Sequence, residues 1–445
     1  MTTLIESVPV LDAFQNLFEA QTASSAEAGW LQQLRRRAFD RAHTIGFPTN
    51  KMEDFRFSKL SGIRNTEFKA VKPKVDVTPA DVEPFTYADL SDLQLVFING
   101  EFRADLSTLT KLPTGVIVTN LHQALKQHVG EMEHYLGQLT ATDTTFFTAM
   151  NEALFRDGLV VYVPDHVKLE TTIHAIFLTT EDSVPTFEAS RSLFVFGEEA
   201  EATIVETHAS LGGGVYFKNT VTEVHMGTGA QVDHYRIQRE SLQSYNVTNL
   251  RLHEDPRSHF RSHGFDFGGL TVRNNLFAKL DGEFCDATLN SLYLLRGKQH
   301  VDNFMWVEHV KEDIPSHELY KGILDEEASA VFTGRLYVHK EAQRTDAKQT
   351  NQNLLLSDDA RINTKPQLEI YADDVKCTHG ATVGQLDPGA LFYLQSRAID
   401  QEAARNLLIL AFAAEITEGI RIDSVRERVE HTLHERLLQD YETSA

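Results

Sequence analysis

The hydrophobic positions of this chain have a helical spacing at both ends and a strand spacing between them. Over residues 1 to about 45, apolar side chains recur every three or four positions in two segments, which is the pattern of amphipathic helices. The side chains that carry this pattern are Leu11, Phe14, Leu17, Phe18, Trp30, Leu31, Leu34 and Phe39. Gly46 and Pro48 follow the second segment and predict its end.

A less regular stretch comes next. An acidic pair, Glu53 and Asp54, precedes an aromatic alternation through Phe55 and Phe57, which predicts a loop that enters a strand. Between residues 70 and 165, strand and helix signals are mixed, with a strand expected near 95–98 and a helix near 121–129.

Strands dominate from about residue 170 to residue 385. Nine segments there have the composition and length of short strands. They read HAIFLTT, SLFVFG, ATIVETH, VTEVHMG, QVDHYRIQ, FRSHGFDFGG, ATLNSLYLL, AVFTGRLYVH and QLEIY. A turn unit, in which an acidic residue or glycine precedes a small residue, recurs at intervals near thirty with one longer interval. Its starting residues are Gly197, Gly227, Asp255, Asp281, Asp325 and Asp358.

This repeat predicts a parallel β-helix, because one coil of a solenoid cannot bury its apolar face without its neighbours. A β-sandwich is the competing fold, since short strands with turn signals also describe it. A sandwich needs tight hairpin turns, yet Asp281-Gly282 is the only Asn-Gly or Asp-Gly pair between residues 170 and 385. We therefore expect a mainly β protein with a parallel β-helix as its core.

The helical spacing returns after Pro388. Asp400 is expected to cap the next helix, because its carboxylate can accept hydrogen bonds from the free N–H groups of the first turn. The apolar stripe predicted for that helix is Ala403, Leu407, Leu408, Leu410, Ala411, Phe412 and Ala414. A charged helix follows over residues 422–438. Such a broad stripe needs a packed partner, either another surface or the open end of the β-helix, which a helix hairpin could cap.

Composition narrows the class of protein. The chain has 445 residues, enough for two or three domains. Its formal net charge of −22 disfavours nucleic acid and anionic membranes as partners. Its two cysteines, Cys285 and Cys377, cannot build a disulfide framework, which favours a reducing compartment. With no secretion signal at its start and no run of about eighteen apolar residues, we expect a soluble cytoplasmic protein.

The strongest candidate site lies on an expected strand, residues 375–383. Alternation puts Cys377 and His379 on the same face, about 7 Å apart. The rest of that face is mostly apolar, so a core role is the simplest interpretation of Cys377. A thiolate beside an imidazole is also a ligand pair suited to iron, zinc or copper. Two ligands do not complete a four-coordinate site, and the others would come from another strand, a partner chain or the cargo.

Familiar catalytic motifs are missing from the sequence. It contains no G-x-x-x-x-G-K-[ST] phosphate loop, no dinucleotide-binding fingerprint, and no G-x-S-x-G, H-E-x-x-H or C-x-x-C. The histidines that fall closest together are His253, His259 and His263, then His300, His309 and His317. On strands these spacings do not converge on one point, so structural roles are expected for them. The acidic turns leave a polysaccharide-cleaving β-helix enzyme as an alternative.

Two segments carry a family resemblance. Residues 320–400, which include CTHGATVGQLD, closely resemble the SufD subunits of the SufBCD iron–sulfur cluster assembly complex, which are members of the SufB/SufD family. GFPTNKMEDFRFSKL is similar to the family's N-terminal segment G-x-P-x-x-x-x-E-D-[WF]-[KR]-[FY]. Residues 65–165 resemble the family only loosely. A SufB-like paralogue shares the core and is an alternative, although the small number of cysteines and the CTHGATVGQLD motif favour the SufD type.

The resemblance implies an architecture and a role. It implies an N-terminal helical and mixed domain over residues 1–165, a right-handed parallel β-helix over 166–386, and a C-terminal helical domain over 387–445. The implied role is that of a non-catalytic scaffold. It would pair with a SufB-like paralogue through the β-helix and present its C-terminal helices to a SufC-like ATPase, which supplies ATP hydrolysis. The sequence leaves open a homodimer in isolation.

The resemblance also implies where the chemistry occurs. The histidine of the family's C-[ST]-H-G-A-T motif, here His379, would face a cysteine of the SufB partner as a candidate ligand for iron or a transient iron–sulfur cluster. Cys377 lies two positions earlier and is the second candidate. A reduced flavin is implied for the complex, and no residue of this sequence is assigned to it. No catalytic residue is expected.

Overall fold

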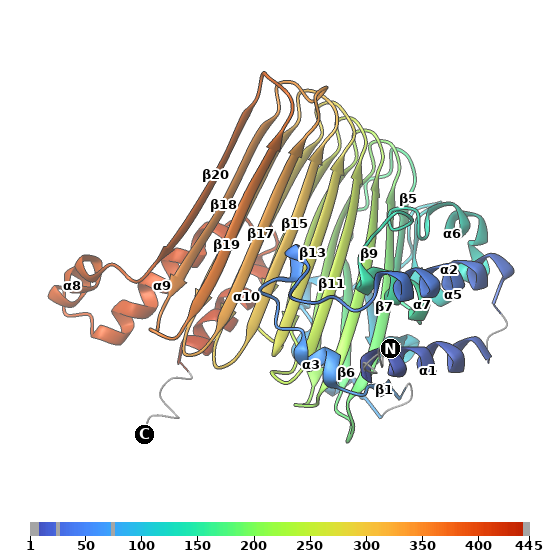
Figure 1. Ribbon diagram of the computed structural model, residues 1–445, viewed down its shortest axis with the longest axis horizontal. Coiled ribbons are helices and arrows are strands. Elements are labelled where there is room, and N and C mark those ends of the chain that lie inside the picture. The colour runs from blue at the N-terminus through green and yellow to red at the C-terminus, as the bar shows by residue number, and fades with distance from the viewer. Residues whose placement is uncertain (1–8, 24–26, 73–75, 439–445) are drawn as a thin grey trace, which may run out of the picture.

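The protein is a parallel β-helix flanked by helices, in a computed structural model that describes residues 9–23, 27–72 and 76–438 (Figure 1). Within these residues two ten-stranded sheets face each other. Along the solenoid the chain alternates between the two sheets, strand by strand. Strands that neighbour each other within a sheet of the solenoid are parallel and in register. The parallel β-helix predicted from the turn repeat is confirmed.

The first sheet, named here the odd sheet, has the order β19-β17-β15-β13-β11-β9-β7-β5-β4, and β1 pairs with β7. Its strands are β1 Lys69–Ala70, β4 Ile117–Asn120, β5 Leu159–Val163, β7 Thr186–Phe196, β9 Tyr216–Met226, β11 Tyr245–Glu254, β13 Thr271–Leu280, β15 His300–His309, β17 Ser329–Val338 and β19 Arg361–Ile370. The second, the even sheet, has the order β20-β18-β16-β14-β12-β10-β8-β6-β2-β3. Its strands are β2 Gln94–Ile98, β3 Glu101–Phe102, β6 Ile173–Thr180, β8 Glu201–Leu211, β10 Gln231–Arg239, β12 His259–Asp266, β14 Asp286–Leu295, β16 Pro315–Leu324, β18 Asp346–Leu355 and β20 Lys376–Gly384.

Alternation along each strand decides which side chains fill the lumen of the solenoid. In β14, Ala287 and Leu289 belong to the cluster that fills the space between the sheets. Leu292 and Leu294 of the same strand pack on the opposite, outer face. Because the strands are in register, each position stacks into a column along the solenoid axis, and neighbouring coils bury one another's apolar groups.

The turn repeat seen in the sequence has one longer interval because it samples two corners of the solenoid. Gly227, Asp255 and Asp281 follow strands of the odd sheet, β9, β11 and β13. Asp325 instead follows β16 of the even sheet. The long interval between Asp281 and Asp325 therefore spans one and a half coils.

The two ends of the solenoid differ. At the N-terminal end, β3 pairs antiparallel with β2 and β4 pairs antiparallel with β5, so a reversed strand ends each sheet. At the C-terminal end, β19 and β20 each end their sheet, with no further strand among the described residues. Most side chains of β20 are exposed. An uncovered strand edge is a ready template for pairing with another chain.

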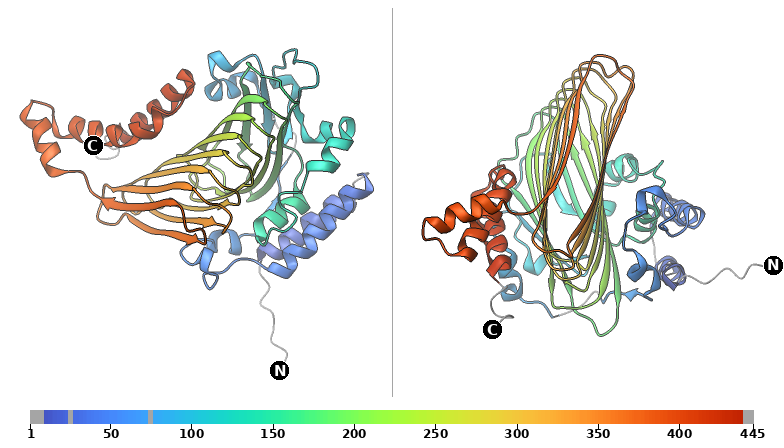
Figure 2. Two further views of the ribbon diagram at one scale, coloured as in Figure 1. Left: turned by 90° about the horizontal axis from the view of Figure 1, so that it is seen from above. Right: turned by 60° about the vertical axis from the view of Figure 1, so that its left-hand side comes forward.

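Helices and short turns of the first part of the chain cover the outer face of the odd sheet, except that those between residues 77 and 106 pack on the outer face of the first strands of the even sheet (Figure 2). They are α1 Pro9–Ala23, α2 Gly29–Ile45, η1 Glu53–Phe55, α3 Ser61–Asn65, α4 Pro79–Val82, η2 Glu83–Phe85, η3 Ala88–Leu90, η4 Ala104–Leu106, α5 Leu121–Gln127, α6 Val129–Tyr135 and α7 Phe146–Leu154. The two long helices predicted before Gly46 are confirmed, with Phe14, Phe18 and Phe39 buried. Residues 1–8 of the first predicted helical region lie outside the described residues.

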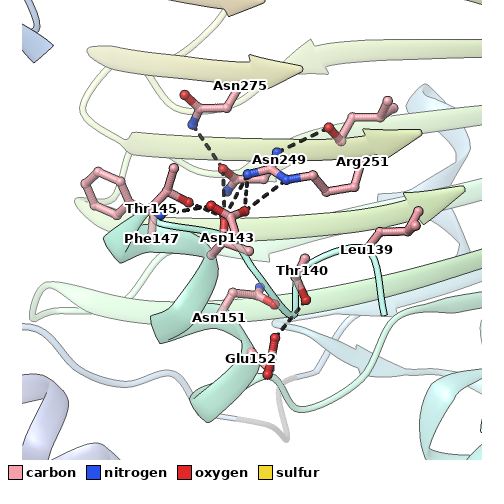
Figure 3. Close-up of polar contacts among 12 residues, drawn as sticks. Leu139, Thr140, Asp143, Thr145, Phe147, Asn151, Glu152, Asn249, Arg251 and Asn275 are labelled. Carbon is pink, nitrogen blue, oxygen red and sulfur yellow. Dashed lines mark hydrogen bonds and ion pairs between the residues drawn. The ribbon is translucent and has the colours of Figure 1, made fainter. Parts of the chain in front are cut away.

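A buried polar network fastens α7 and the loop before it to the odd sheet (Figure 3). Asp143 accepts hydrogen bonds from the guanidinium of Arg251 on β11. Thr140 donates to Glu152 of α7 at 2.8 Å. Burial favours the neutral form of a carboxyl, yet the pKa of Asp143 is lowered, because the charge of Arg251 and nearby N–H donors outweigh that burial.

The same junction contains a fully buried ion pair. Arg191 of β7 lies 2.6 Å from Glu223 of β9, and both side chains are 0% exposed. Glu223 also accepts hydrogen bonds from the backbone N–H groups of Gly137 at 2.9 Å and Leu139 at 3.0 Å. The loop before α7 is thus held to the sheet by a carboxylate with both oxygens satisfied.

Residues 46–60 cross the outer face of the odd sheet as a strap. The strand expected through Phe55 is wrong, because Glu53–Phe55 forms a single 3₁₀ turn, η1. Glu53 pairs with Lys365 of β19, and the carboxylate of Asp54 lies 3.7 Å from the guanidinium of Arg335 on β17. The acidic pair therefore ties the N-terminal region to the last coils of the solenoid.

Three helices follow β20: α8 Pro388–Ser396, α9 Gln401–Thr417 and α10 Asp423–Leu438. Asp400 caps α9 as predicted, since its side chain accepts from the N–H groups of Glu402 and Ala403. Helices α9 and α10 lie along the outer face of the even sheet (Figure 2). Of the two alternatives for these helices, the hairpin that caps the open end is therefore excluded. These helices run beside the solenoid because their apolar face fits the apolar outer face of that sheet.

The buried face of α9 is not the predicted one. Ala404, Ile409, Ala413 and Ile416 are buried, whereas Leu407 is 49% exposed. The helix is apolar on most of its circumference, so periodicity did not select a face. α8 has no buried residue and stands away from the sheets (Figure 1). Among the described residues, no helix combines the length and apolarity needed to span a bilayer.

Candidate functional site

The end strand β20 carries the two candidate residues. Strand register pairs Cys377 with Ala347 of β18, and His379 with Gln349. Ala347 belongs to the interior cluster, so Cys377 and His379 lie on the lumen-facing side of their strand. The structure thus brings both side chains to the mouth of the lumen at the open end, on one face, as the alternation predicts.

The two side chains differ in exposure. His379 is exposed, and among the described residues its ring makes no hydrogen bond or ion pair. Cys377 is half-buried against the interior cluster. Burial raises the pKa of the Cys377 thiol, and the charges of Asp346 and Glu318 add to the rise, against a backbone hydrogen bond from Ala347. The thiol is therefore protonated at neutral pH unless a cation or a base draws its proton away.

The described part of this chain does not complete a metal site by itself. It contains no group of three or more His, Cys, Asp or Glu side chains close enough to hold an ion. A thiolate and an imidazole at the mouth of the lumen nevertheless suit iron. Further ligands would have to come from a second chain or from the bound species itself.

Several of the other histidines are buried inside the fold, among them His263, His300 and His309. His309 Nε2 lies 3.1 Å from the Ser316 hydroxyl, and His300 Nδ1 lies 2.9 Å from the Ser329 hydroxyl. Burial lowers the pKa of His309 to about 3 and that of His263 to about 4, so both rings are neutral at pH 7. Neutral, enclosed rings of this kind support packing.

Cys285 is the second thiol of the chain and lies in the interior cluster, 0% exposed. Burial raises its pKa, and the neighbouring carboxyl of Glu254 raises it further. A protonated, enclosed thiol is inert, which leaves Cys377 as the accessible one.

Sequence reasoning missed two residues directly behind His379. The column that contains His379 continues inward through Gln349 of β18 and Glu318 of β16. Gln349 is 1% exposed and Glu318 is 2% exposed. The available signal was the alternation itself, because Glu318 shares a face with Tyr320, an interior residue. A face with a serine, a glutamate and a tyrosine resembles a solvent face in a sequence.

The C-terminal helices present apolar side chains to solvent. On α8, Phe392 is 72% exposed and Tyr393 is 58% exposed, and Leu407 of α9 is 49% exposed. We name these three the helix patch. Large apolar side chains that are exposed on neighbouring helices are typical of a protein interaction site.

A cavity of about 820 Å³ lies between the N-terminal helices and the solenoid. Polar groups at its wall already have partners: Asp157 accepts from Asn120 Nδ2 at 2.8 Å and from the backbone N–H of His122 at 2.9 Å. Arg35 donates to Glu27 at 2.9 Å. Groups that satisfy one another are typical of a structural junction.

Comparisons with known proteins place the chain in a family. The family model described as the SUF system FeS cluster assembly, SufBD core domain matches residues 177–412, and that of the SufBD protein N-terminal region matches residues 10–175. The iron-sulfur cluster assembly protein SufD of Escherichia coli is 32% identical over 98% of this chain and 99% of its own length. A SufBD family protein of Synechocystis is 33% identical over 96% of each chain, and SufD of Bacillus subtilis is 25% identical over 94% and 97%. This chain therefore belongs to the SufBD family of iron–sulfur cluster assembly proteins.

Proposed function

We propose that this chain is a non-catalytic scaffold subunit that holds a nascent iron–sulfur cluster together with a SufB-like paralogue, while a SufC-like ATPase drives the complex. The main observation that supports this proposal is that Cys377 and His379 face the lumen at the exposed edge where the even sheet ends. A ligand pair in that position can be completed by a second chain and released when the chains move apart.

The backbone of the open end supports pairing with a paralogue. β19 and β20 each present one unpaired edge of N–H and C=O groups, and both edges lie at the same end of the solenoid. A partner with a matching β-helix could continue both sheets across the boundary by strand addition. That pairing would also cover the side chains of β20, most of which are exposed here.

The helix patch is the proposed binding surface for the ATPase. Its exposed members, Phe392, Tyr393 and Leu407, lie on α8 and α9. α8 follows β20 directly in the chain and contributes no buried residue, so it is the least restrained link between the patch and the strand with His379. A nucleotide-driven shift of the helices would therefore reach the cluster site through α8.

Family membership favours this assembly role over the carbohydrate-active alternative. The reduced flavin implied by the family resemblance would act at the level of the complex, and the residues of this chain that would contact it are not assigned.

The test is His379→Ala in a complex reconstituted from the chain, its SufB-like paralogue and the ATPase. The rate of cluster formation should fall by roughly tenfold or more, the usual effect of perturbing a metal site. The isolated subunit should keep its thermal midpoint, because the His379 ring is exposed and makes no hydrogen bond or ion pair among the described residues. The matched control is His317→Ala, an exposed histidine on the outward side of β16. Cluster formation at the normal rate in His379→Ala would exclude the ligand role.

A further inference from the structure

Two side chains in the lumen behind His379 have no hydrogen bonds. Neither carboxylate oxygen of Glu318, and neither the nitrogen nor the oxygen of the Gln349 amide, has a partner among the described residues. Both residues are almost completely buried, at 2% and 1% exposed. Buried polar groups are nearly always paired, so two adjacent residues with four unpaired atoms indicate that something else occupies the space beside them.

These side chains lie in line with the candidate ligands. Glu318 is the register neighbour of Gln349, and Gln349 is the register neighbour of His379. Neighbouring strands are about 4.8 Å apart, so the three residues form a column that leads from the mouth inward. The charge of Glu318 also reaches Cys377, whose thiol pKa it helps to raise. The buried carboxyl therefore acts electrostatically on Cys377, the half-buried member of the ligand pair.

The facing sheet is shaped to leave room for this column. A Cβ on Gly334 of β17 would lie 2.5 Å from the Gln349 amide nitrogen, so a larger residue there would push the amide out of place. Thr364 of β19 is the register neighbour of the interior residue Phe332, and its hydroxyl oxygen also lacks a partner. Unpaired oxygens thus come from both sheets, and the lack of a side chain at Gly334 is what gives the Gln349 amide its place between them.

We propose that Glu318 and Gln349 form an oxygen-donor site for a divalent cation, directly behind His379. In the working complex the cation would be ferrous iron, an identification that rests on the proposed function. A carboxylate oxygen and an amide carbonyl oxygen are suitable ligands for such an ion, with water in the remaining positions. The site would hold iron next to the ligand pair at the mouth, before it joins the cluster.

The charge balance of this step is simple. Burial raises the pKa of the Glu318 carboxyl to about 8, against a smaller lowering by the Ser316 hydroxyl, which lies outside hydrogen-bond geometry, so without a cation the group is neutral at pH 7. When the cation binds, the carboxyl loses its proton to solvent at the open end, and a metal–oxygen bond takes the place of the O–H bond. No oxidant or reductant is needed, because the metal keeps its charge.

The experiment is an anaerobic titration of the purified full chain with Co²⁺ alone, a stable substitute for ferrous iron with a visible absorption band. The wild-type chain should bind Co²⁺, and Glu318→Gln and Gln349→Met should each weaken binding by roughly tenfold or more. The matched control is Glu254→Gln. Glu254 is equally buried and has one unpaired carboxylate oxygen, but it lies on β11, outside this column. Its replacement should leave Co²⁺ affinity unchanged.

Wild-type affinity in a folded Glu318→Gln variant would overturn the proposal, and so would an equal loss in Glu254→Gln. If Glu318→Gln does not fold, Co²⁺ binding by two other variants tests the proposal. Gln349→Met removes the amide oxygen, and Gly334→Ala displaces it. The outcome is separate from that of the proposed function. Suppose that His379→Ala assembles clusters normally and Glu318→Gln binds Co²⁺ weakly. The role of His379 as a cluster ligand would then be rejected, and the cation site at Glu318 and Gln349 would be supported.

Discussion

Charged side chains are buried both at the junction with the N-terminal helices and at the open C-terminal end. The two regions differ in whether those side chains have hydrogen-bond partners. At the junction, Glu223 is enclosed with Arg191 at 2.6 Å and with two backbone N–H donors. At the open end, Glu318 is equally enclosed, and neither of its oxygens is bonded among the described residues. His379, in the same column, is exposed.

This difference distinguishes buried polar groups that stabilise the fold from buried polar groups that are available to a ligand. A buried charge with all its partners adds geometric definition to the fold, and removing one partner is strongly destabilising. A buried acid without partners lowers stability where it stands, and such a residue is retained where it serves a ligand. The junction, where the buried charges have partners, stabilises the fold. The open end, where they do not, is the part that we expect a ligand or a second chain to complete.

The largest effect should come from breaking the junction. Arg191→Met leaves the carboxylate of Glu223 buried without its cation, so the free energy of unfolding should fall by about 3–5 kcal/mol. Urea unfolding of the isolated chain measures this. The matched control is Lys168→Met, which removes an exposed ion pair with Glu201 and should change stability by less than about 1 kcal/mol. Equal effects of the two variants would contradict the claim that the buried Arg191–Glu223 pair stabilises the fold more than an exposed ion pair does.

At the open end, replacing the buried acidic residue should increase the free energy of unfolding instead of lowering it. Burial raises the pKa of Glu318 from 4.5 to about 8. The native carboxyl keeps its proton while the unfolded one loses it above pH 4.5, so its contribution to stability is present below pH 4.5 and is lost as the pH rises to 8. Glu318→Gln should therefore be more stable than the wild type by roughly 3 kcal/mol at pH 7, and equal to it near pH 4.5. A pH-independent difference would contradict the unpaired state of Glu318.

A smaller difference should separate the two thiols. Cys377 is half-buried at the mouth, whereas Cys285 is fully buried in the interior. A maleimide added to the folded chain should modify Cys377 first, faster as the pH rises, because burial raises its thiol pKa. Mass spectrometry of Cys285→Ser and Cys377→Ser identifies the site. Equal modification of both thiols in folded protein would place Cys377 deeper than described.

The smallest effect on stability should come from the helix patch. Phe392→Ser changes a side chain that is 72% exposed, so the unfolding free energy should move by no more than about 0.5 kcal/mol. Affinity for the ATPase should nevertheless fall, as a pull-down with purified partner would show. Ile409→Ala on the buried side of α9 serves as the control, with an expected loss of about 2–5 kcal/mol. Unchanged ATPase affinity in Phe392→Ser would remove the patch as the docking surface.

The sequence predicts the β-helix because alternation and turns repeat in it, but several strands escape that pattern. β13 and β15 were not predicted, since they carry charged residues such as Arg273 and Asp302 at buried positions. These two form an ion pair with each other beneath the strap. A charge that is buried through a partner more than twenty residues away gives no local signal, and period-2 patterns treat it as a solvent face.

The site could be predicted in part for the same reason. Period 2 places Cys377 and His379 on one face whatever the surroundings, so their shared direction follows from spacing alone. Which face lies inside does not follow from spacing, and Glu318 and Gln349 were missed. The position of α9 was missed because a helix that is apolar on most sides can pack in several ways.

The central claim is that the open end of the solenoid is completed by a second chain. Amide hydrogen exchange of this protein, alone and with its SufB-like paralogue, tests it most directly. The amides of β19 and β20 should become strongly protected in the complex, while those of α8 should not change until the ATPase is added. A complex that forms with the exchange of β20 unaltered would show that the partner binds elsewhere and that His379 lies outside the interface.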